Sequence, residues 1–475
     1  MEFVDREAEL EVLKKANKRT GSSLVTIYGR RRLGKTELIT RFIKSASNGV
    51  YYLATKEDST VQLKSLSSLV GIQIKDQELS RFGAVDWEAL FLRIRNRQTK
   101  GKLIIAIDEF PYLAHSNNAI SSIFQKGWDQ YLKDANVVLI LCGSSISMMH
   151  SQVLDYSAPL YQRSTSILEM RPLPINASFL LTPNMKFEDK LYTYFIFGGV
   201  PAYYSFTEKS MSINDIIYDI FSPGSVFLDE PSTILSEETT NEARYIDILE
   251  LISNGINHTN EIASKTKIRP SNVTRYLDVL ERIGIVKKVF PITEGQSRRS
   301  KRGVYEIQDN YLRFWFRYIK RNRDLLNTAG DKAVEDKVIK ELSLIGGGTF
   351  EKFAMDFVRS LRRKGFPQLL SIGKWWGRNP NKKAGLNEEE IDLVAINDVS
   401  KDILFGECKW TNSKVDVDVY RQLKEKAKLV KWNENNRKEH FILFSKSGFT
   451  DKLIDLAEKE GVMLFDLNAI EKVLV

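Results

Sequence analysis

The stretch that most constrains the fold is SSLVTIYGRRRLGKTELITRFI, residues 22–43. It joins an apolar run, a glycine-containing turn and a segment with helical spacing of its apolar residues. Gly29 is followed by four residues and then by Gly34-Lys35-Thr36. In a strand-to-helix context this spacing is that of a phosphate-binding loop, where backbone N–H groups converge on phosphates. The stretch therefore predicts an α/β domain with a parallel sheet.

The loop residues have separate expected roles in binding ATP. Lys35 reaches the outer phosphates and the Thr36 hydroxyl ligates Mg²⁺, whereas the variable positions present backbone amides. The predicted nucleotide-binding residues are Gly29, Arg30, Arg31, Arg32, Leu33, Gly34, Lys35 and Thr36. We expect at least one of the three arginines to bridge to the following lid or to a basic module when ATP is bound. The alternative is a solvated cationic rim.

Two later apolar runs end in polar residues that suit the same site. KLIIAIDEFPYL, residues 102–113, predicts a buried strand that ends in Asp108-Glu109. Asp108 suits a second Mg²⁺ ligand, and Glu109 could polarise the attacking water. The strand predicted in NVVLILCGSS, residues 136–145, ends near Ser144, whose hydroxyl could sense the γ-phosphate.

Composition places the chain among folded globular proteins of several domains. It has 475 residues, of which 43% are apolar and 28% charged, more than one ordinary core accommodates. It contains no run of about 18 apolar residues, and its start, MEFVDREAEL, has no signal-peptide pattern. Cys142 and Cys408 form neither a disulfide framework nor a zinc spacing. These features predict a cytoplasmic protein without a membrane partner.

The positive charge is concentrated in one segment. The chain carries a net charge of +9, and residues 261–330 hold 16 Lys and Arg against 7 Asp and Glu. The segment thus contains the whole excess. A localised basic patch of this kind favours a polyanion partner.

The same segment has the pattern of a winged helix. ARYIDILELISNG, residues 243–255, predicts one helix. Residues 259–286 predict a short helix, a turn and a longer helix opened by Pro270, whose inner face would be Val273, Tyr276, Leu277 and Leu280. Two short apolar strands around the basic loop GQSRRSKRG, residues 295–303, would form the wing.

A winged helix in this register would direct two groups of side chains towards DNA. The start of the recognition helix offers Arg269, Ser271, Asn272, Thr274 and Arg275. The wing offers Arg298, Arg299, Lys301 and Arg302 for phosphate or minor-groove contacts. The alternative is that the module packs between domains and contacts no DNA.

The C-terminal part contains a carboxylate pattern. NEEEIDLVAINDVSKDILFGECKW, residues 387–410, predicts strands at 391–396 and 403–410 around a turn at Asn397-Asp398. Side chains alternate along a strand, so Glu407 and Lys409 share a face, and strand pairing could bring Asp392 there. Two carboxylates could hold Mg²⁺ with the Cys408 carbonyl, and the lysine could orient or deprotonate a water.

These motifs together resemble those of the archaeal ATPase family, signal-transducing P-loop ATPases related to AAA+ proteins. The resemblance rests on FVDREAEL, YGRRRLGKTEL, LIIAIDEFPYL, LILCGSS, APLYQRSTSILEMRPL and FGGVPAYY, which occur in this order. It implies that residues 3–10 lie against the adenine and that Arg163 is an arginine finger, in cis or in trans. It also implies that the element containing Pro201 begins a lid that reports the nucleotide state.

The C-terminal pattern resembles the PD-(D/E)xK nuclease superfamily, including the tail attached to many archaeal ATPases of this type. The resemblance implies catalytic roles for Asp392, Glu407 and Lys409, for Glu351 as the acid of a first helix, and for Gln422 in a following helix. Ile391 stands where the superfamily has proline. A solvated hairpin with salt bridges is the alternative.

The expected architecture is a P-loop NTPase core with a parallel sheet and helical lid, a winged helix and a restriction-endonuclease-like α/β domain. The expected boundaries are 1–175 for the core, 176–239 for the lid, 240–325 for the winged helix, 326–345 for a helical linker and 346–475 for the nuclease-like domain. The leading hypothesis is an ATPase that binds DNA and cleaves it with Mg²⁺. The alternatives are a signalling switch with a non-cleaving tail and a chaperone-like ATPase; a homo-oligomer is possible in each case.

Overall fold

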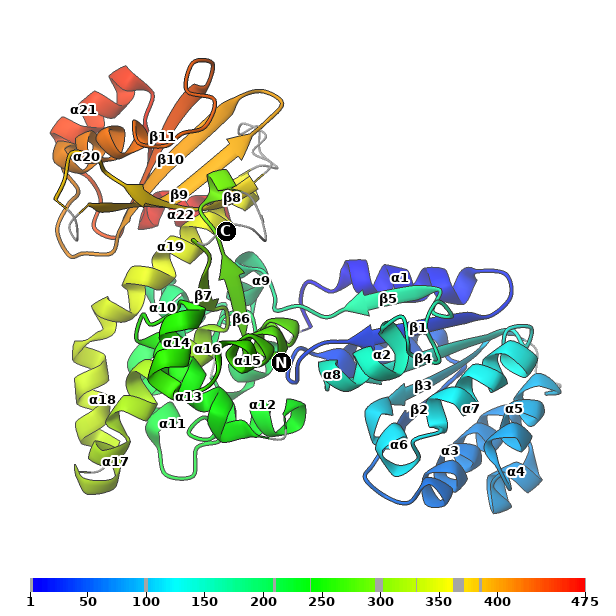
Figure 1. Ribbon diagram of the computed structural model, residues 1–475. Coiled ribbons are helices and arrows are strands. Elements are labelled where there is room, and N and C mark those ends of the chain that lie inside the picture. Colours follow the sequence, from blue (N-terminus) through cyan, green and yellow to red (C-terminus); the bar gives the residue numbers. More distant parts are fainter. Residues whose placement is uncertain are drawn as a thin grey trace. The chain divides into compact units, whose positions relative to one another are not determined.

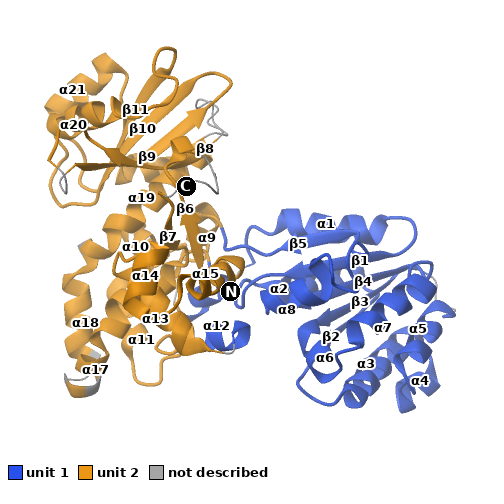
Figure 2. Ribbon diagram, in the orientation of Figure 1, with its two compact units in different colours: residues 1–173, 200–206, 233–240 blue, residues 174–199, 207–232, 241–475 orange. Residues whose placement is uncertain are grey.

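The chain folds into two compact units, shown in Figure 2 on a computed structural model. Unit 1 comprises residues 1–173, 200–206 and 233–240, and unit 2 comprises residues 174–199, 207–232 and 241–475. The structure describes residues 3–97, 101–207, 211–239, 241–294, 302–329, 331–361, 371–383 and 387–474. Within these ranges no helix has the length and apolar character needed to cross a membrane.

Unit 1 is built on the predicted parallel sheet, whose strand order is β2-β3-β4-β1-β5 (Figure 1). The strands are β1 (Ser23–Tyr28), β2 (Gly49–Leu53), β3 (Leu103–Asp108), β4 (Val137–Gly143) and β5 (Ser166–Glu169). Every neighbouring pair is parallel. The central strands β3 and β4 are buried along their whole length, as expected for a sheet covered on both faces.

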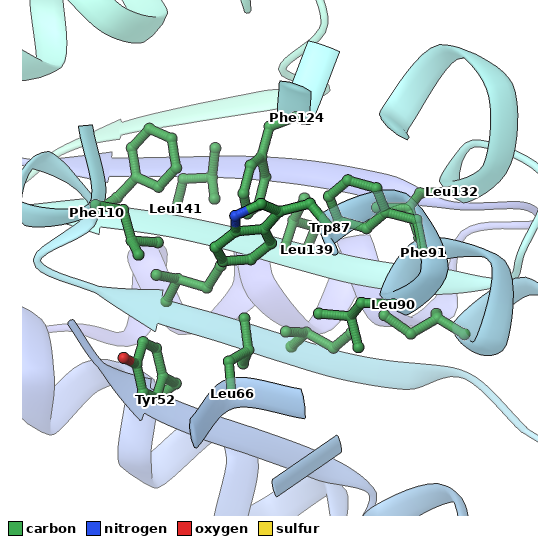
Figure 3. Packing of buried hydrophobic residues seen from close by; sticks show 14 of the residues in the cluster. Tyr52, Leu66, Trp87, Leu90, Phe91, Phe110, Phe124, Leu132, Leu139 and Leu141 are labelled. Atoms are coloured by element: carbon green, nitrogen blue, oxygen red, sulfur yellow. The ribbon is translucent and has the colours of Figure 1, made fainter. Parts of the chain in front are cut away.

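Helices surround this sheet. They are α1 (Glu7–Lys18), α2 (Lys35–Ala46), α3 (Ser59–Ile74), α4 (Gln77–Phe82), α5 (Trp87–Arg95), α6 (Phe110–Ser116), α7 (Ile120–Gly127) and α8 (Ile146–Met149). Figure 3 shows Trp87, Phe91 and Phe124 packed over Leu139 and Leu141 of β4. Because strand residues alternate between faces, Val138 and Ile140 point to the other side of the sheet.

The sheet order brings the polar residues that follow three of the strands to the same edge of the sheet. Strand β4 lies between β1 and β3, and Gly143 pairs with Tyr28 while Leu141 pairs with Ile107. The residues that follow β1, β3 and β4 therefore emerge at one edge of the sheet. In open α/β sheets, ligands bind at this carboxyl edge.

Unit 2 begins with a helical region. Its helices are α9 (Ile175–Leu180), α10 (Phe187–Phe197), α11 (Ile213–Phe221), α13 (Glu242–Ser253), α14 (Thr259–Thr266), α15 (Pro270–Arg282), α16 (Asn310–Phe314), α17 (Arg323–Ala329) and α18 (Asp331–Lys340). Helix α12 (Glu230–Glu238) is divided between the units after residue 232. The antiparallel pair β6 (Val286–Val289) and β7 (Val304–Ile307) follows α15. The predicted helices and strands of residues 243–307 are thus confirmed.

The C-terminal part of unit 2 is a five-stranded mixed sheet of order β12-β11-β10-β9-β8. Its elements are β8 (Ser371–Arg378), β9 (Glu388–Asn397), β10 (Asp402–Lys409), α20 (Val417–Ala427), β11 (Lys438–Ser445), α21 (Asp451–Glu460), β12 (Met463–Asp466) and α22 (Leu467–Leu474). Strands β9 and β10 pair antiparallel, whereas β10, β11 and β12 are parallel. The predicted hairpin of residues 391–410 is confirmed, and Trp375 of β8 is buried in its core.

The amphipathic spacing of GGTFEKFAMDFVRSLRRKG, residues 347–365, predicts a helix that begins near Phe350-Glu351, and this start is wrong. Helix α19 runs from Leu342 to Leu361 and includes Gly346, Gly347 and Gly348. A Cβ atom on Gly346 would lie 1.9 Å from the Trp410 indole nitrogen. Glycine is therefore required at position 346 for the indole to approach the helix, although it weakens the helical signal in the sequence.

Candidate functional site

The loop between β1 and α2 has the geometry of a phosphate cradle. Gly29 has φ 147° and Gly34 has φ 86°, which glycine adopts without strain. A Cβ atom at Gly29 would lie 2.4 Å from the Met170 carbonyl oxygen. The buried Lys35 ammonium donates to the carbonyl oxygens of Gly29 and Arg30 at 2.7 and 2.8 Å. The lysine is thus held inside the loop, where burial lowers its pKa.

Asp108 lies next to the start of α2, as predicted. It is 1% exposed, and its Oδ2 accepts hydrogen bonds from the Thr36 hydroxyl at 2.6 Å and from the Tyr51 hydroxyl at 2.9 Å. Burial, together with the neighbouring Asp108 carboxylate, raises the pKa of Tyr51 and keeps the phenol a donor. The adjacent hydroxyl and carboxylate oxygens are the donor set that Mg²⁺ prefers.

Glu109 and Ser144 contact each other. Glu109 follows β3 with a left-handed φ of 52°, and its Oε2 accepts hydrogen bonds from the backbone N–H and hydroxyl of Ser144 at 3.0 and 2.9 Å. The sheet order explains this meeting, since β3 and β4 are neighbours. The two residues predicted to serve the γ-phosphate separately are therefore coupled.

Arg31 and Arg32 contact later segments of unit 1. The Arg31 guanidinium lies 2.6 Å from the Glu237 carboxylate. The Arg32 guanidinium lies over the Tyr203 ring at 5.4 Å, and the Arg32 carbonyl accepts from the Ala202 N–H at 3.3 Å. Residues 202 and 203 belong to a 3₁₀ helix that begins at Pro201. These contacts join loop arginines to residues of the 176–239 segment. The expectation of a bridge concerns the ATP-bound protein, and it stays a prediction.

Arg163 does not lie at the nucleotide site of its own chain. It precedes Thr165, whose N–H donates to the Leu24 carbonyl, and Ser166 pairs with Val25 near the start of β1. The phosphate loop follows Tyr28, at the opposite end of β1. Leu24 and Tyr28 are four strand residues apart, which corresponds to about 13 Å along the strand. The Arg163 guanidinium pairs with Asp129 at 3.0 Å. Of the two predicted arrangements of an arginine finger, the one in cis does not occur in this structure.

The segment predicted to lie against the adenine packs against the loop. Arg6 is buried, and its guanidinium donates to the carbonyl oxygens of Leu33 and Arg171 at 3.2 and 2.8 Å. The ring of Phe3 lies 4.5 Å below the Arg41 guanidinium. The first residues thus border the phosphate loop and the first helix after it.

A second polar cluster lies on the mixed sheet of unit 2. Asp392 of β9 accepts a hydrogen bond from the Cys408 N–H at 2.8 Å, which places its carboxylate beside Glu407. The Lys409 ammonium lies 2.7 Å from the Glu407 carboxylate. Burial, together with the negative charge of Glu407 and then of Glu351, raises the pKa of Asp392 to about 7. The predicted convergence of Asp392, Glu407 and Lys409 is confirmed.

Two further lysines neutralise acids of this carboxylate–lysine cluster. The Lys374 ammonium lies 2.6 Å from Glu351 and 3.1 Å from Glu390, and Lys426 lies 3.2 Å from Glu407. Gln422, predicted to be the helical polar residue, is exposed one turn before Lys426. Among the described residues, no group of three His, Cys, Asp or Glu side chains is placed to hold a metal ion.

The predicted DNA-contacting residues fall into two sets. At the start of α15, the side chains of Arg269, Ser271, Asn272, Thr274 and Arg275 are exposed. Val273, Leu277 and Leu280 of the same helix are buried, and Tyr276 stacks edge-on against Tyr245. Arg298, Arg299 and Lys301 lie outside the described residues. Arg302 pairs with Glu294 at 2.5 Å and donates to the Trp376 carbonyl oxygen.

Comparison with known proteins agrees with the geometry of the loop. Residues 3–203 match a family described as an ATPase domain predominantly from Archaea. The uncharacterized protein MJECL04 of Methanocaldococcus jannaschii is 34% identical over 472 residues, which cover 98% of this chain and 99% of that protein. The chain belongs to this archaeal ATPase family.

Two further similarities concern parts of the chain. The Walker-type ATPase PABY2304 of Pyrococcus abyssi superimposes with a TM-score of 0.52 at 18% identity, covering 66% of this chain and 96% of that protein. At this identity the likeness concerns the fold, a P-loop ATPase fold with a parallel sheet. Residues 315–426 match a second family, described as "Archaea bacterial proteins of unknown function".

Several residues of these sites carry no recognisable sequence signal. Tyr51 is one of two adjacent tyrosines in a strand, and only the pairing of β2 with β3 brings it to Asp108. Lys374 and Lys426 belong to charged stretches that predict solvated faces. Glu237 belongs to a short acidic helix end. Their positions depend on elements distant in sequence.

Replacing Tyr51 by phenylalanine should weaken Mg²⁺-dependent nucleotide binding. The variant keeps the ring but removes the hydroxyl that donates to Asp108. A hydrogen bond to a charged group contributes about 1.5–3 kcal/mol, so the half-saturating Mg²⁺ concentration should rise roughly tenfold. It is measured by titrating Mg²⁺ into protein with a fluorescent ATP analogue. Tyr52→Phe, on the opposite face of β2, is the control, and an unchanged Mg²⁺ dependence of Tyr51→Phe would contradict the assignment.

Replacing Asp392 by asparagine should stabilise unit 2 more at pH 8 than at pH 5. The folded-state pKa of about 7 exceeds the ordinary value of 3.8, so wild-type stability falls as pH rises through this window. The amide keeps an acceptor for the Cys408 N–H and cannot ionise. The gain should approach about 4 kcal/mol above pH 7, measured by calorimetric unfolding in EDTA. The exposed Asp418→Asn is the control, and an equal gain at both pH values would refute the prediction.

Proposed function

We propose that this protein is an ATP-hydrolysing, DNA-binding protein in which the nucleotide state controls contact with DNA. The nucleotide part rests on the loop of residues 29–36 and its neighbour Asp108. The observation that supports DNA binding is that the excess positive charge and an exposed helix start occur in the same segment. The segment that holds the excess positive charge, residues 261–330, contains the exposed start of α15.

The order of elements supports the DNA part. Helices α14 and α15 are followed by the β6–β7 hairpin, which is the order of a winged helix. In helix-turn-helix proteins the first residues of the second helix meet DNA. Arg269 and Arg275 are exposed there. Packing between domains, the alternative, would favour apolar side chains at these positions, whereas the residues present suit phosphates and base edges.

The chain has the residues for ATP hydrolysis. Lys35 would hold the outer phosphates, and Thr36 and Asp108 would hold Mg²⁺. Bound ATP and Mg²⁺ would supply the phosphoanhydride bond and the charge that makes phosphorus electrophilic. Glu109 would orient the attacking water once its carboxylate exchanges the Ser144 hydrogen bonds for that water.

DNA binding should depend on the start of α15. The double variant Arg269→Gln, Arg275→Gln should bind duplex DNA more weakly, with a shallower dependence of log Kd on log salt. The slope should fall by about 0.9 for each DNA phosphate that the variant no longer neutralises. Fluorescence anisotropy across a salt series measures both quantities. Arg302 is left intact, because its interactions with Glu294 and Trp376 support the hairpin.

The matched control for this prediction is Arg93→Gln, Lys126→Gln. Both side chains are about half exposed on unit 1 and belong to surface ion pairs, so the net charge changes equally. Equal effects of the two double variants would refute a site at α15. Control by nucleotide is tested with Lys35→Ala, which should abolish any difference in DNA affinity between protein with and without ATP.

A second candidate activity is metal-dependent cleavage of DNA by unit 2. It is favoured by the position of Asp392 beside Glu407 and Lys409 on an antiparallel strand pair. Burial and then the negative charge of Glu407 raise the pKa of Asp392, and a divalent cation would relieve the repulsion between the two carboxylates. The proposed protein ligands are these two carboxylates and the Cys408 carbonyl. A switch that binds DNA without cleaving it is the alternative.

Plasmid nicking decides between cleavage and binding alone. Wild-type protein with Mg²⁺ or Mn²⁺ should nick supercoiled DNA. Loss of an outer-shell partner of a metal ligand typically costs about 10–100-fold, so Asp392→Asn, which alters a proposed ligand itself, should reduce the rate at least about 100-fold. Because this variant should be more stable than wild type at pH 8, a loss of nicking would not reflect unfolding. Asp418→Asn is again the control. Equal nicking by Asp392→Asn, or none by wild type, would leave the non-cleaving switch.

A further inference from the structure

A short acidic segment of α12 contacts the nucleotide loop. Residues 233–240 belong to unit 1, although the residues before and after them in the chain belong to unit 2. Glu237 lies 2.6 Å from Arg31, at the second variable position of the loop. The ion pair joins positions that are about 200 residues apart in the sequence.

The next residue, Glu238, binds the segment after β4. Its carboxylate accepts hydrogen bonds from the N–H groups of Ile146 and Ser147 at 2.8 and 3.1 Å and from the Ser145 hydroxyl at 3.3 Å. This segment begins at Ser144, which holds Glu109. Two adjacent glutamates of α12 therefore contact both the phosphate loop and the segment that fixes the predicted catalytic carboxylate.

Electrostatics makes this interaction sensitive to phosphate. Burial raises the pKa of Glu237, Arg31 lowers it, and Glu109 and Glu238 raise it again. Three carboxylates thus gather beside a loop that is suited to bind a polyanion. Further negative charge on the loop would repel Glu237 and Glu238 and compete with Glu237 for Arg31.

We propose that residues 233–239 form an acidic latch that holds the ATPase site in a low-affinity, low-activity state and opens when nucleotide phosphates occupy the loop. This inference rests on the proposed function, because it requires ATP at residues 29–36. Glu237 acts through Arg31, and Glu238 acts through Ser145–Ser147 and hence through the Ser144–Glu109 pair. Both glutamates are positioning residues.

The chain connections give the latch a consequence for unit 2. Helix α12 begins at Glu230, and residues 207–232 belong to unit 2, as does the chain from residue 241 onwards. Residues 233–239 are therefore joined to unit 2 at both ends. Their release from the loop would also release these two chain connections from unit 1. Because binding linkage is reciprocal, a partner that holds α12 away from the loop would strengthen nucleotide binding.

The latch is tested by removing its charges in the full-length chain. Glu237→Gln, Glu238→Gln should lower the Kd of a fluorescent ATP analogue at least about fivefold, the lower end of typical coupling. It should also lower KM for ATP and raise kcat. Glu78→Gln, which breaks an exposed ion pair with Arg93 on the same unit, should change neither. An unchanged or weaker affinity of the double variant would overturn the proposal.

A double-mutant cycle and hydrogen exchange provide independent readouts. If Glu237 acts through Arg31, the affinity effects of Arg31→Gln and Glu237→Gln should not be additive. Backbone amides of residues 233–239 should exchange faster when Mg²⁺ and a non-hydrolysable ATP analogue are added to wild type. Additive effects, or equal or slower exchange with the analogue bound, would overturn the latch. If wild-type protein binds no nucleotide, this result would instead overturn the proposed function, on which the latch depends.

Discussion

The nucleotide site depends on the buried carboxylate of Asp108. An unpaired charge in a protein interior is costly, so its oxygens must be satisfied by donors. The donors come from three parts of unit 1: the Thr36 hydroxyl at the start of α2, the Tyr51 hydroxyl on β2, and the Glu109 N–H after β3. One anion thus connects the phosphate loop, an outer strand and Glu109, the proposed catalytic residue. In the proposed function, the same donors would hold Asp108 in position to ligate Mg²⁺.

The carboxylates of the carboxylate–lysine cluster in unit 2 also have hydrogen-bonding and charged partners, but of a different kind. Asp392 and Glu407 lie on neighbouring strands of the mixed sheet. Lys409 and Lys426 pair with Glu407, whereas Asp392 accepts a hydrogen bond from the Cys408 N–H. Lys374 pairs with Glu351. Charges are therefore largely balanced within the protein, and a divalent cation would have to compete with Lys426 and Lys409 for Glu407. In the nucleotide loop, a carboxylate and a cation are likewise paired within the protein, because Glu237 contacts the Arg31 guanidinium.

Sequence reasoning succeeded where a short stretch contains its own structural signal. The loop of residues 29–36, the strands ending at Asp108 and Gly143, and helix α15 with buried Val273, Leu277 and Leu280 were all predicted from spacing. The approach of Asp392 to Glu407 was predicted because a tight turn between two strands constrains their pairing. The start of α19 was missed, since three consecutive glycines normally end a helix and the need of Trp410 for Gly346 is a long-range effect.

The sequence by itself determined the class of protein and the residues of the loop, because glycine conformations and apolar periodicity act over a few residues. Only the tertiary structure decided which of these residues meet. The strand order brought Ser144 to Glu109 and Tyr51 to Asp108, and it left Arg163 at the opposite edge of the sheet, paired with Asp129. It also placed Glu237 against Arg31. Such interactions depend on how elements far apart in the chain pack, and no local spacing encodes that.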